Sequence, residues 1–377
     1  RQIEKFRPET YWQAFITVKN SHELELKYVK DISKKQELKK FEKLKGKDIL
    51  VKTEKKEQVI PPNPPFNLTT LQTEAYRIHG ITPSRTLVAA QSLYLSGLIS
   101  YPRTSSQKLP NAISYKEILE KMAERYNAQK MITREKPVEG KKTDPAHPSI
   151  HPTGNFQILS GDEEKIYNLI AKKFISLFCG DAIMDNKKIS AIVDGMEFNT
   201  RGSFIREKGW TEIYPITLHE KEAPDFEGKA RITGSRTEEK ETQPPKRYSP
   251  ASIISELERR NLGTKATRTS IIDTLYGRNY IRERSIEATP LGVSLIGAME
   301  KYSPIIIDEN LTRNFEREMN LIQEAKKDFG KMEEEVIKKA EDSVNKIIIQ
   351  FEKNEKNIGA ELLSANVLLN KQRKEEN

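Results

Sequence analysis

The chain has 377 residues, more than one ordinary hydrophobic core can hold, so the sequence predicts two to four domains. Charged residues make up 32%, the net charge is +9, and there is one cysteine, Cys179. A single thiol excludes a disulfide framework and a cysteine-based zinc site, and no apolar run is long enough to span a membrane. The basic surplus favours a polyanionic partner such as nucleic acid, but a lysine-rich solvated surface explains it equally well.

The N-terminal part predicts β structure interrupted by a charged stretch. Residues 12–18 alternate between polar and apolar side chains, which predicts a strand. Between Lys27 and Lys56 the chain holds 12 lysines mixed with acidic residues, a pattern typical of a solvated face or a mobile hairpin. The prolines of residues 61–65 end this part, because a helix cannot continue through them.

Residues 66–180 predict helices, because apolar residues recur at three- and four-residue steps. Ser160 and Glu163 have the spacing of a capping box that opens an apolar helix, and Gly180 is a suitable residue to end it. Strand patterns return over residues 182–243. The simplest topology is therefore a discontinuous β domain with a helical domain inserted into it.

The rest of the chain predicts helices with one hairpin. Ser249 followed by Pro250 is a helix start signal, a second helix is expected near residues 270–276, and residues 280–289 predict a hairpin. This is the order of a winged helix-turn-helix, although a plain helical hairpin with a short strand fits equally well. Residues 315–351 predict one or two long amphipathic helices.

An extended segment with a tyrosine follows a predicted helix that ends near Gly97. Residues i and i+2 of an extended chain point to the same side, so Tyr101 and Arg103 can face one phosphate. A phenol with a pKa near ~10 is a weak nucleophile, and a guanidinium favours the phenolate and neutralises the phosphate under attack. Thr104, Ser105 and Ser106 can donate further hydrogen bonds. On these residues alone, a structural tyrosine beside a surface arginine is the more common explanation.

A second cluster holds two of the five histidines, His147 and His151. Pro148 and Pro152 make a helix implausible there, so the histidines lie on a rigid loop. Three interpretations stay open: a metal pair, for which no third ligand is evident, a proton or phosphate partner for a distant nucleophile, and a loop histidine satisfied by hydrogen bonds.

Several motifs together resemble the type IA DNA topoisomerases, and the archaeal topoisomerase I and reverse gyrase branch is the most similar. They are Phe-Asn-Leu-Thr-Thr-Leu-Gln at 66–72, Ser-Arg-Thr-Leu-Val-Ala-Ala-Gln at 84–91 and Gly-Leu-Ile-Ser-Tyr-Pro-Arg-Thr at 97–104. Weaker similarities follow in the family's order at residues 6–12, 146–153, 263–268, 271–275 and 311–316. The resemblance covers roughly residues 1–350, and the tyrosine segment is its most specific motif.

The resemblance implies a mechanism. A tyrosine hydroxyl attacks a phosphodiester of single-stranded DNA, a 5′-phosphotyrosyl link forms, another strand passes through the gap, and the 3′-hydroxyl reseals the break without ATP. By position, Tyr101 is the nucleophile, Arg103 binds and polarises the phosphate, and His147 is an active-site histidine. We also expect DNA contacts from Arg85, Thr104, Ser106, His151, Lys265, Thr267 and Arg268.

The sequence departs from the family's pattern in two ways. The family binds Mg²⁺ through an Asp-x-Asp-x-Glu cluster in an N-terminal Toprim domain, and this sequence contains no Asp-x-Asp. We therefore expect that the chain binds no metal, that it needs the Toprim domain and Mg²⁺ for activity, and that it is inactive alone. Ser105 stands where many members have Asp.

The expected fold class is α+β multidomain, arranged as a toroid. The expected parts are the end of a preceding domain (1–8), a discontinuous β arch domain (9–60 plus 182–243), a helical, winged-helix-like domain with the tyrosine (61–181), a helical DNA-binding domain with a winged-helix-like element (244–365), and a disordered tail (366–377). The expected partners are single-stranded DNA, negatively supercoiled duplex DNA and the Toprim domain. We expect a monomer in the cytoplasm, associated with the nucleoid and not with a membrane.

Three other functions compete with this interpretation. In tyrosine recombinases the tyrosine usually follows the Arg and His motifs, whereas Tyr101 precedes His147. A relaxase needs a metal-binding histidine cluster, which the sequence does not show. The strongest alternative is a non-catalytic DNA-binding module that uses the winged helix and the basic surface alone.

Overall fold

The computed structural model describes residues 2–216, 218–325 and 327–376, which divide into two compact units. The first, here called the barrel unit, consists of Arg1–Pro64, Glu120–Val138 and Lys172–Lys246. The second, here called the tyrosine unit, consists of Pro65–Leu119, Glu139–Ala171 and Arg247–Asn377. In the part of the chain that is described, every helix is too short or too polar to cross a membrane.

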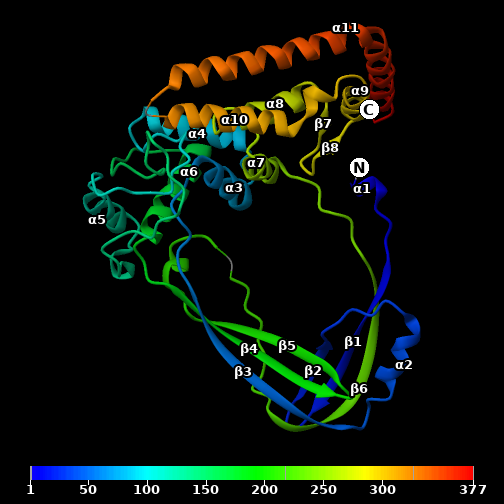
Figure 1. Cartoon of the computed structure of the whole chain (residues 1–377). Coiled ribbons are helices and arrows are strands. Elements are labelled where there is room, and N and C mark those ends of the chain that lie inside the picture. The colour runs from blue at the N-terminus through cyan, green and yellow to red at the C-terminus, as the bar shows by residue number, and fades with distance from the viewer. Residues whose placement is uncertain (1, 217, 326, 377) are drawn as a thin grey trace. The chain divides into compact units, whose positions relative to one another are not determined.

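Six antiparallel strands of the barrel unit close into one barrel in the order β1-β2-β5-β4-β3-β6 (Figure 1). Their bounds are β1 Thr10–Lys19, β2 Glu23–Tyr28, β3 Asp48–Ile60, β4 Ala182–Val193, β5 Met196–Glu207 and β6 Gly228–Glu241. Strands from before and after the helical insertion pair directly with each other, because β1 pairs with β6, β2 with β5, and β3 with both β4 and β6. Closure leaves this sheet without an exposed edge.

The interior of the barrel is apolar and comes from the alternating residues that the sequence predicts. On β1 the fully buried residues are Ala14, Ile16 and Val18, which confirms the predicted strand. Phe198 of β5 lies in the same core, with its ring 5.4 Å from that of Tyr28 and 6.1 Å from that of Phe41.

The lysine-rich stretch is only partly the solvated face that its charges suggest. Within it lie a short 3₁₀ helix, η1 Lys35–Leu38, the helix α2 Lys39–Glu42 and most of β3. Phe41 and Leu44 are fully buried in the barrel core, so apolar side chains fix a segment whose lysines stay outside.

The tyrosine unit is built from helices and one hairpin. Its helices are α3 Leu68–His79, α4 Pro83–Leu95, α7 Pro250–Arg259, α8 Arg268–Gly277, α9 Pro290–Tyr302, α10 Glu309–Glu324 and α11 Phe329–Glu376. The hairpin, β7 Ile281–Arg282 with β8 Glu287–Ala288, follows α8 as the sequence predicts. The predicted start of α7 is confirmed, because the Ser249 hydroxyl accepts a hydrogen bond from the Ser252 N–H at its N-cap. Buried Gln72 of α3 donates to Thr269 of α8 at 2.9 Å, which ties the two helices together.

Three further helices complete the chain: α1 Gln2–Lys5, α5 Tyr115–Arg125 and α6 Gly161–Ser176. The expected end of α6 at Gly180 is wrong, because the α-helix ends at Ser176. The next three residues form a tighter turn, in which each backbone N–H donates to the carbonyl three residues earlier. The turn buries Cys179, and burial raises the pKa of its thiol to about 11.

Two segments differ from their expected grouping. Residues 120–138 and 172–181 belong to the barrel unit, where Arg134 forms an ion pair with Asp181 at 2.6 Å. The segment expected to be a disordered tail continues α11 as far as Glu376.

Candidate active site around Tyr101

The end of α4 aims the chain toward the tyrosine. Gly97 adopts a left-handed conformation with φ 69°, which a residue with a side chain rarely takes, and the chain leaves the helix extended. The extended stretch then pairs with the histidine loop: Thr153 donates its N–H to the Leu98 carbonyl at 3.0 Å, and Ser100 donates its N–H to the His151 carbonyl at 2.9 Å. Tyr101 follows at the end of this pairing.

The Tyr101 ring lies against two other rings. The Tyr94 ring from α4 is 5.3 Å away in an edge-on contact, and the His147 ring is 4.5 Å away at an angle of 44°. The structure therefore brings together the predicted nucleophile and the predicted active-site histidine. The Tyr101 hydroxyl forms no hydrogen bond with any residue among those described, so it is available to a substrate.

Arg103 is half-buried two residues further on. Within the described parts of the chain its guanidinium makes neither a hydrogen bond nor an ion pair. A cation without a protein partner is suited to bind an external anion.

The neighbouring hydroxyls are placed differently from their predicted role. Thr104 and Ser106 are 1% and 2% exposed. The Thr104 hydroxyl donates to the His147 carbonyl at 3.4 Å and accepts from the Ser106 N–H at 3.0 Å, while the Ser106 hydroxyl accepts from the Lys108 N–H at 3.1 Å. Buried hydroxyls that already have partners are suited to hold this segment in one conformation. Their expected DNA contacts stay a prediction.

His151 is also placed inside the loop. Its ring is 7% exposed, and Nδ1 lies 3.1 Å from the Pro152 carbonyl oxygen. Burial lowers the pKa of His151 to about 4, because a charged ring would lose its hydration. A neutral, buried imidazole does not offer a charge to a phosphate, so the expected DNA contact of His151 does not fit this conformation.

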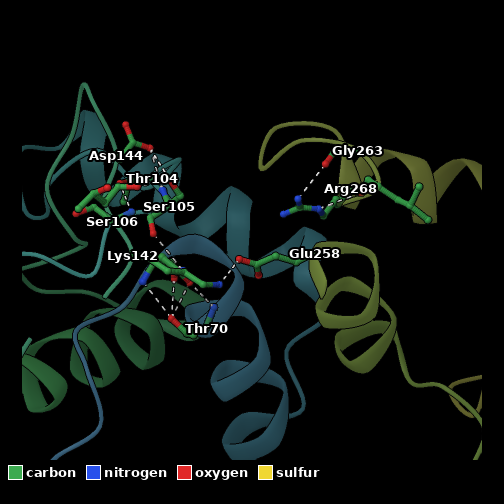
Figure 2. Close-up of polar contacts among 12 residues, drawn as sticks. Thr70, Thr104, Ser105, Ser106, Lys142, Asp144, Glu258, Gly263 and Arg268 are labelled. Carbon is green, nitrogen blue, oxygen red and sulfur yellow. Dashed lines mark hydrogen bonds and ion pairs between the residues drawn. The ribbon is translucent and has the colours of Figure 1, made fainter. Parts of the chain in front are cut away.

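Sequence reasoning missed Asp144, which lies beside Ser105 (Figure 2). Its side chain is 1% exposed. Its Oδ2 accepts hydrogen bonds from the backbone N–H and the hydroxyl of Ser105, both at 3.0 Å, and forms an ion pair with Lys265. Its Oδ1 accepts from the N–H groups of Ala146 at 3.1 Å and His147 at 3.3 Å. Desolvation raises the pKa of Asp144, but Lys265 and these donors outweigh it and hold the pKa far below the usual range. The only signal in the sequence was an acidic residue three positions before a histidine.

The other predicted DNA contacts have protein partners of their own. Lys265 forms an ion pair with Asp144, which in turn binds Ser105 of the tyrosine segment. The Arg268 guanidinium donates to the Leu262 carbonyl at 3.2 Å and to the Gly263 carbonyl at 2.9 Å, which closes the turn between α7 and α8 (Figure 2). Exposed Thr267 accepts from the Thr264 N–H at 2.9 Å at the N-cap of α8.

Arg85 also has a partner, because it makes two hydrogen bonds to Asp162, both at 2.8 Å.

A metal site would require a group of at least three His, Cys, Asp or Glu side chains, and no such group occurs among the described residues. The two histidines of the loop therefore do not belong to such a group.

A family model described as DNA topoisomerase matches residues 1–334 of this chain. The chain belongs to the DNA topoisomerase family. "DNA topoisomerase 1" of Pyrococcus horikoshii is 40% identical over 388 residues, which cover 96% of this chain and 55% of that protein. "DNA topoisomerase 1" of Methanothermobacter thermautotrophicus is 40% identical over 375 residues, which cover 97% of this chain and 52% of that protein. The resemblance to type IA topoisomerases is thus confirmed, and the chain spans about half the length of these relatives.

A solved structure shares the fold. The full-length topoisomerase I of Thermotoga maritima superposes with a TM-score of 0.72 at 22% identity, covering 92% of this chain and 60% of that one. This likeness shows a common mixture of helices and sheets.

Proposed function

We propose that this chain carries the strand-cutting centre of a type IA DNA topoisomerase, with Tyr101 as the nucleophile. The observation that carries the proposal is that the Tyr101 ring, on the family's tyrosine motif, lies against the His147 ring with 4.5 Å between the ring centroids. Among the described residues the Tyr101 hydroxyl has no hydrogen-bond partner. Arg103, two residues away and also without a partner in the described parts of the chain, supplies the positive charge that a phosphate requires.

The proposed reaction is a transesterification. The Tyr101 oxygen bonds to a backbone phosphorus of single-stranded DNA, the bond from phosphorus to the 3′-oxygen breaks, and the phenolic proton is lost as the 3′-oxygen gains one. In this proposal Arg103 neutralises the phosphate, and His147, whose ring lies against that of Tyr101, holds the proton. Resealing reverses each step, so the bond energy is kept and no ATP is needed.

The rest of the proposal extends beyond this chain. The described residues do not fit a Mg²⁺ site, so no step passes through a metal held here. We propose that a Toprim domain holds Mg²⁺ in the complete enzyme, that the chain is inactive without it, and that the joined domains form the toroid expected from the family resemblance. The proposed substrates are single-stranded and negatively supercoiled DNA, handled by a monomer at the nucleoid in the cytoplasm.

The test joins the chain to a family Toprim domain and adds Mg²⁺ with a labelled single-stranded oligonucleotide. The expected result is a covalent protein–DNA adduct that maps to Tyr101, together with relaxation of negatively supercoiled plasmid. Binding without any adduct would instead support the alternative, a non-catalytic DNA-binding module.

The chain alone should bind single-stranded DNA in a salt-sensitive way. The +9 charge and the available Arg103 motivate this expectation, because neutralising phosphates releases counterions. Affinity measured from low to moderate salt should fall steeply, and an affinity that does not change with salt would contradict a phosphate-dominated site.

A further inference from the structure

We propose that Asp144 is a positioning residue that fixes Tyr101 and His147 relative to each other. The inference rests on the proposed function of Tyr101 and adds a residue to which neither the sequence motifs nor the family match assigns a role.

The Asp144 carboxylate joins three segments of the chain. Its two oxygens bind donors from three separate segments: Ser105 of the tyrosine segment, Ala146 and His147 of the histidine loop, and Lys265 of the turn before α8. A side chain that is 1% exposed and accepts five donors has little freedom to move. These segments therefore share one fixed point.

Hydrogen bonds hold the chain on both sides of Tyr101. Before Tyr101, the chain is held at Ser100, whose hydroxyl donates to the Ser149 carbonyl at 3.1 Å and accepts from the His151 N–H at 3.0 Å. After Tyr101, it is held at Ser105 by Asp144. Tyr101 and Arg103 thus lie on a short stretch between two anchors, and both anchors bind the histidine loop.

This arrangement explains how reactive groups without partners stay in place. The Tyr101 hydroxyl and the Arg103 guanidinium must be left free for substrate, so their own polar contacts cannot position them. Asp144 instead holds the backbone at Ser105 and at His147. A misplacement of reacting groups by about 1 Å can slow a reaction on the order of 10²-fold, so this support affects rate directly.

Ser105 is a donor in this network, at a position where many family members are expected to have Asp. An aspartate there would place a second carboxylate about 3 Å from Asp144, where the Ser105 hydroxyl now lies at 3.0 Å. Two carboxylates this close repel each other unless one is protonated. In this chain one carboxylate, that of Asp144, pairs with Lys265 and accepts the hydrogen bonds at the junction where the tyrosine segment, the histidine loop and the turn before α8 meet.

The main test is Asp144→Asn in the chain joined to the Toprim domain. The amide keeps the size of the carboxylate but has one accepting oxygen, so it cannot serve both sets of donors. The single-turnover cleavage rate of the folded variant should fall on the order of 10–10²-fold, while its affinity for uncleaved single-stranded DNA changes little. The melting temperature should also fall, because Lys265 and the buried backbone donors lose the charge that they bind, so the rate is measured well below the unfolding transition. Asp194→Asn is the matched control, because it removes the carboxylate of an exposed Lys47 pair in the barrel unit and should leave the rate unchanged.

A second measurement does not depend on activity. In the chain itself, the ring protons of His147 should show the upfield NMR shift expected of a proton near the Tyr101 ring, and Asp144→Asn should reduce it. If the wild-type enzyme forms no adduct, the proposed function fails while this measurement still tests the positioning role. A variant with the wild-type rate and an unchanged His147 shift would overturn the inference.

Variants at Ser105 extend the test if Asp144→Asn fails to fold. Ser105→Ala removes only the hydroxyl donor and should lower the rate in the same direction, by less. Ser105→Asp should be harmful alone, and its combination with Asp144→Asn, which leaves one carboxylate at the junction, should recover part of the rate. An active Ser105→Asp single variant would contradict the one-carboxylate junction.

Discussion

In the closed barrel the buried side chains are apolar, such as Ile16, Leu26 and Phe198, and the charged residues lie outside. Around Tyr101 the buried set includes polar groups, such as Thr104 and Ser106, each with a hydrogen-bond partner. Apolar packing is not directional, so it stabilises the barrel without fixing any single atom. Hydrogen bonds have defined lengths and angles, so they can hold a loop in one geometry.

This difference predicts different consequences of substitution. A change in the barrel core should lower the free energy of unfolding of the barrel unit and leave the chemistry of folded molecules intact. A change of a reacting side chain near Tyr101 should slow the reaction and leave the free energy of unfolding almost unchanged. The variants below test this separation.

The largest expected effect is that of Tyr101→Phe in the chain joined to the Toprim domain. The substitution keeps the ring that packs against Tyr94 and His147 and removes only the attacking oxygen. Covalent DNA capture should therefore disappear while the melting temperature stays the same. Tyr94→Phe is the matched control and should retain capture; an adduct that persists in Tyr101→Phe would show that another residue is the nucleophile.

Phe198→Ala tests the barrel side of the comparison. Deleting a fully buried ring that contacts Tyr28 and Phe41 should lower the free energy of unfolding by about 3–5 kcal/mol. Phe204→Ala, on the same strand but 61% exposed, should change it by only about 0.5 kcal/mol. Denaturant titration of both variants measures the two values, and equal losses would mean that the barrel core does not lie where the structure places it.

Arg103→Ala should slow cleavage on the order of 10²–10³-fold without changing the melting temperature, because one electrostatic contact to the phosphate is lost. Arg103→Lys keeps the charge but not the bidentate geometry, so its cleavage rate should lie between those of wild type and Arg103→Ala.

His147→Ala should lower the cleavage rate on the order of 10²-fold. These rates come from single-turnover assays. If an Arg103 or His147 variant melts much earlier and its rate only follows the unfolded fraction, that residue is structural.

The smallest expected effect is a pH dependence of stability from His151. Its pKa is about 4 in the folded chain and about 6.5 when unfolded, so below pH 6.5 the unfolded chain gains a proton that the folded chain does not. Stability should therefore fall as pH decreases from about 6.5 to about 4, by about 2 kcal/mol at pH 5. Denaturant titration of wild type and His151→Gln at pH 7 and pH 5 measures how much unfolding free energy each protein loses between the two pH values. If both lose the same amount, His151 does not cause the pH dependence.

The sequence by itself determined the features that depend on neighbouring residues. The alternation of β1, the N-cap of α7 at Ser249 and the hairpin after α8 follow from local patterns, and the structure has all three. The tyrosine motif also identified the family, because the order of residues along an extended segment is itself the signal. The exact end of α6 was less predictable, since a glycine permits a helix to end without requiring it.

Only the tertiary structure decided which polar residues near Tyr101 face outward. Thr104, Ser106 and His151 resemble DNA contacts by residue type, but pairing of the tyrosine segment with the histidine loop buries them. Asp144 could not be recognised from the sequence, because its donors lie 39 residues away at Ser105 and 121 residues away at Lys265. Burial and long-range hydrogen bonds depend on which segments meet in space, and local sequence patterns do not contain that information.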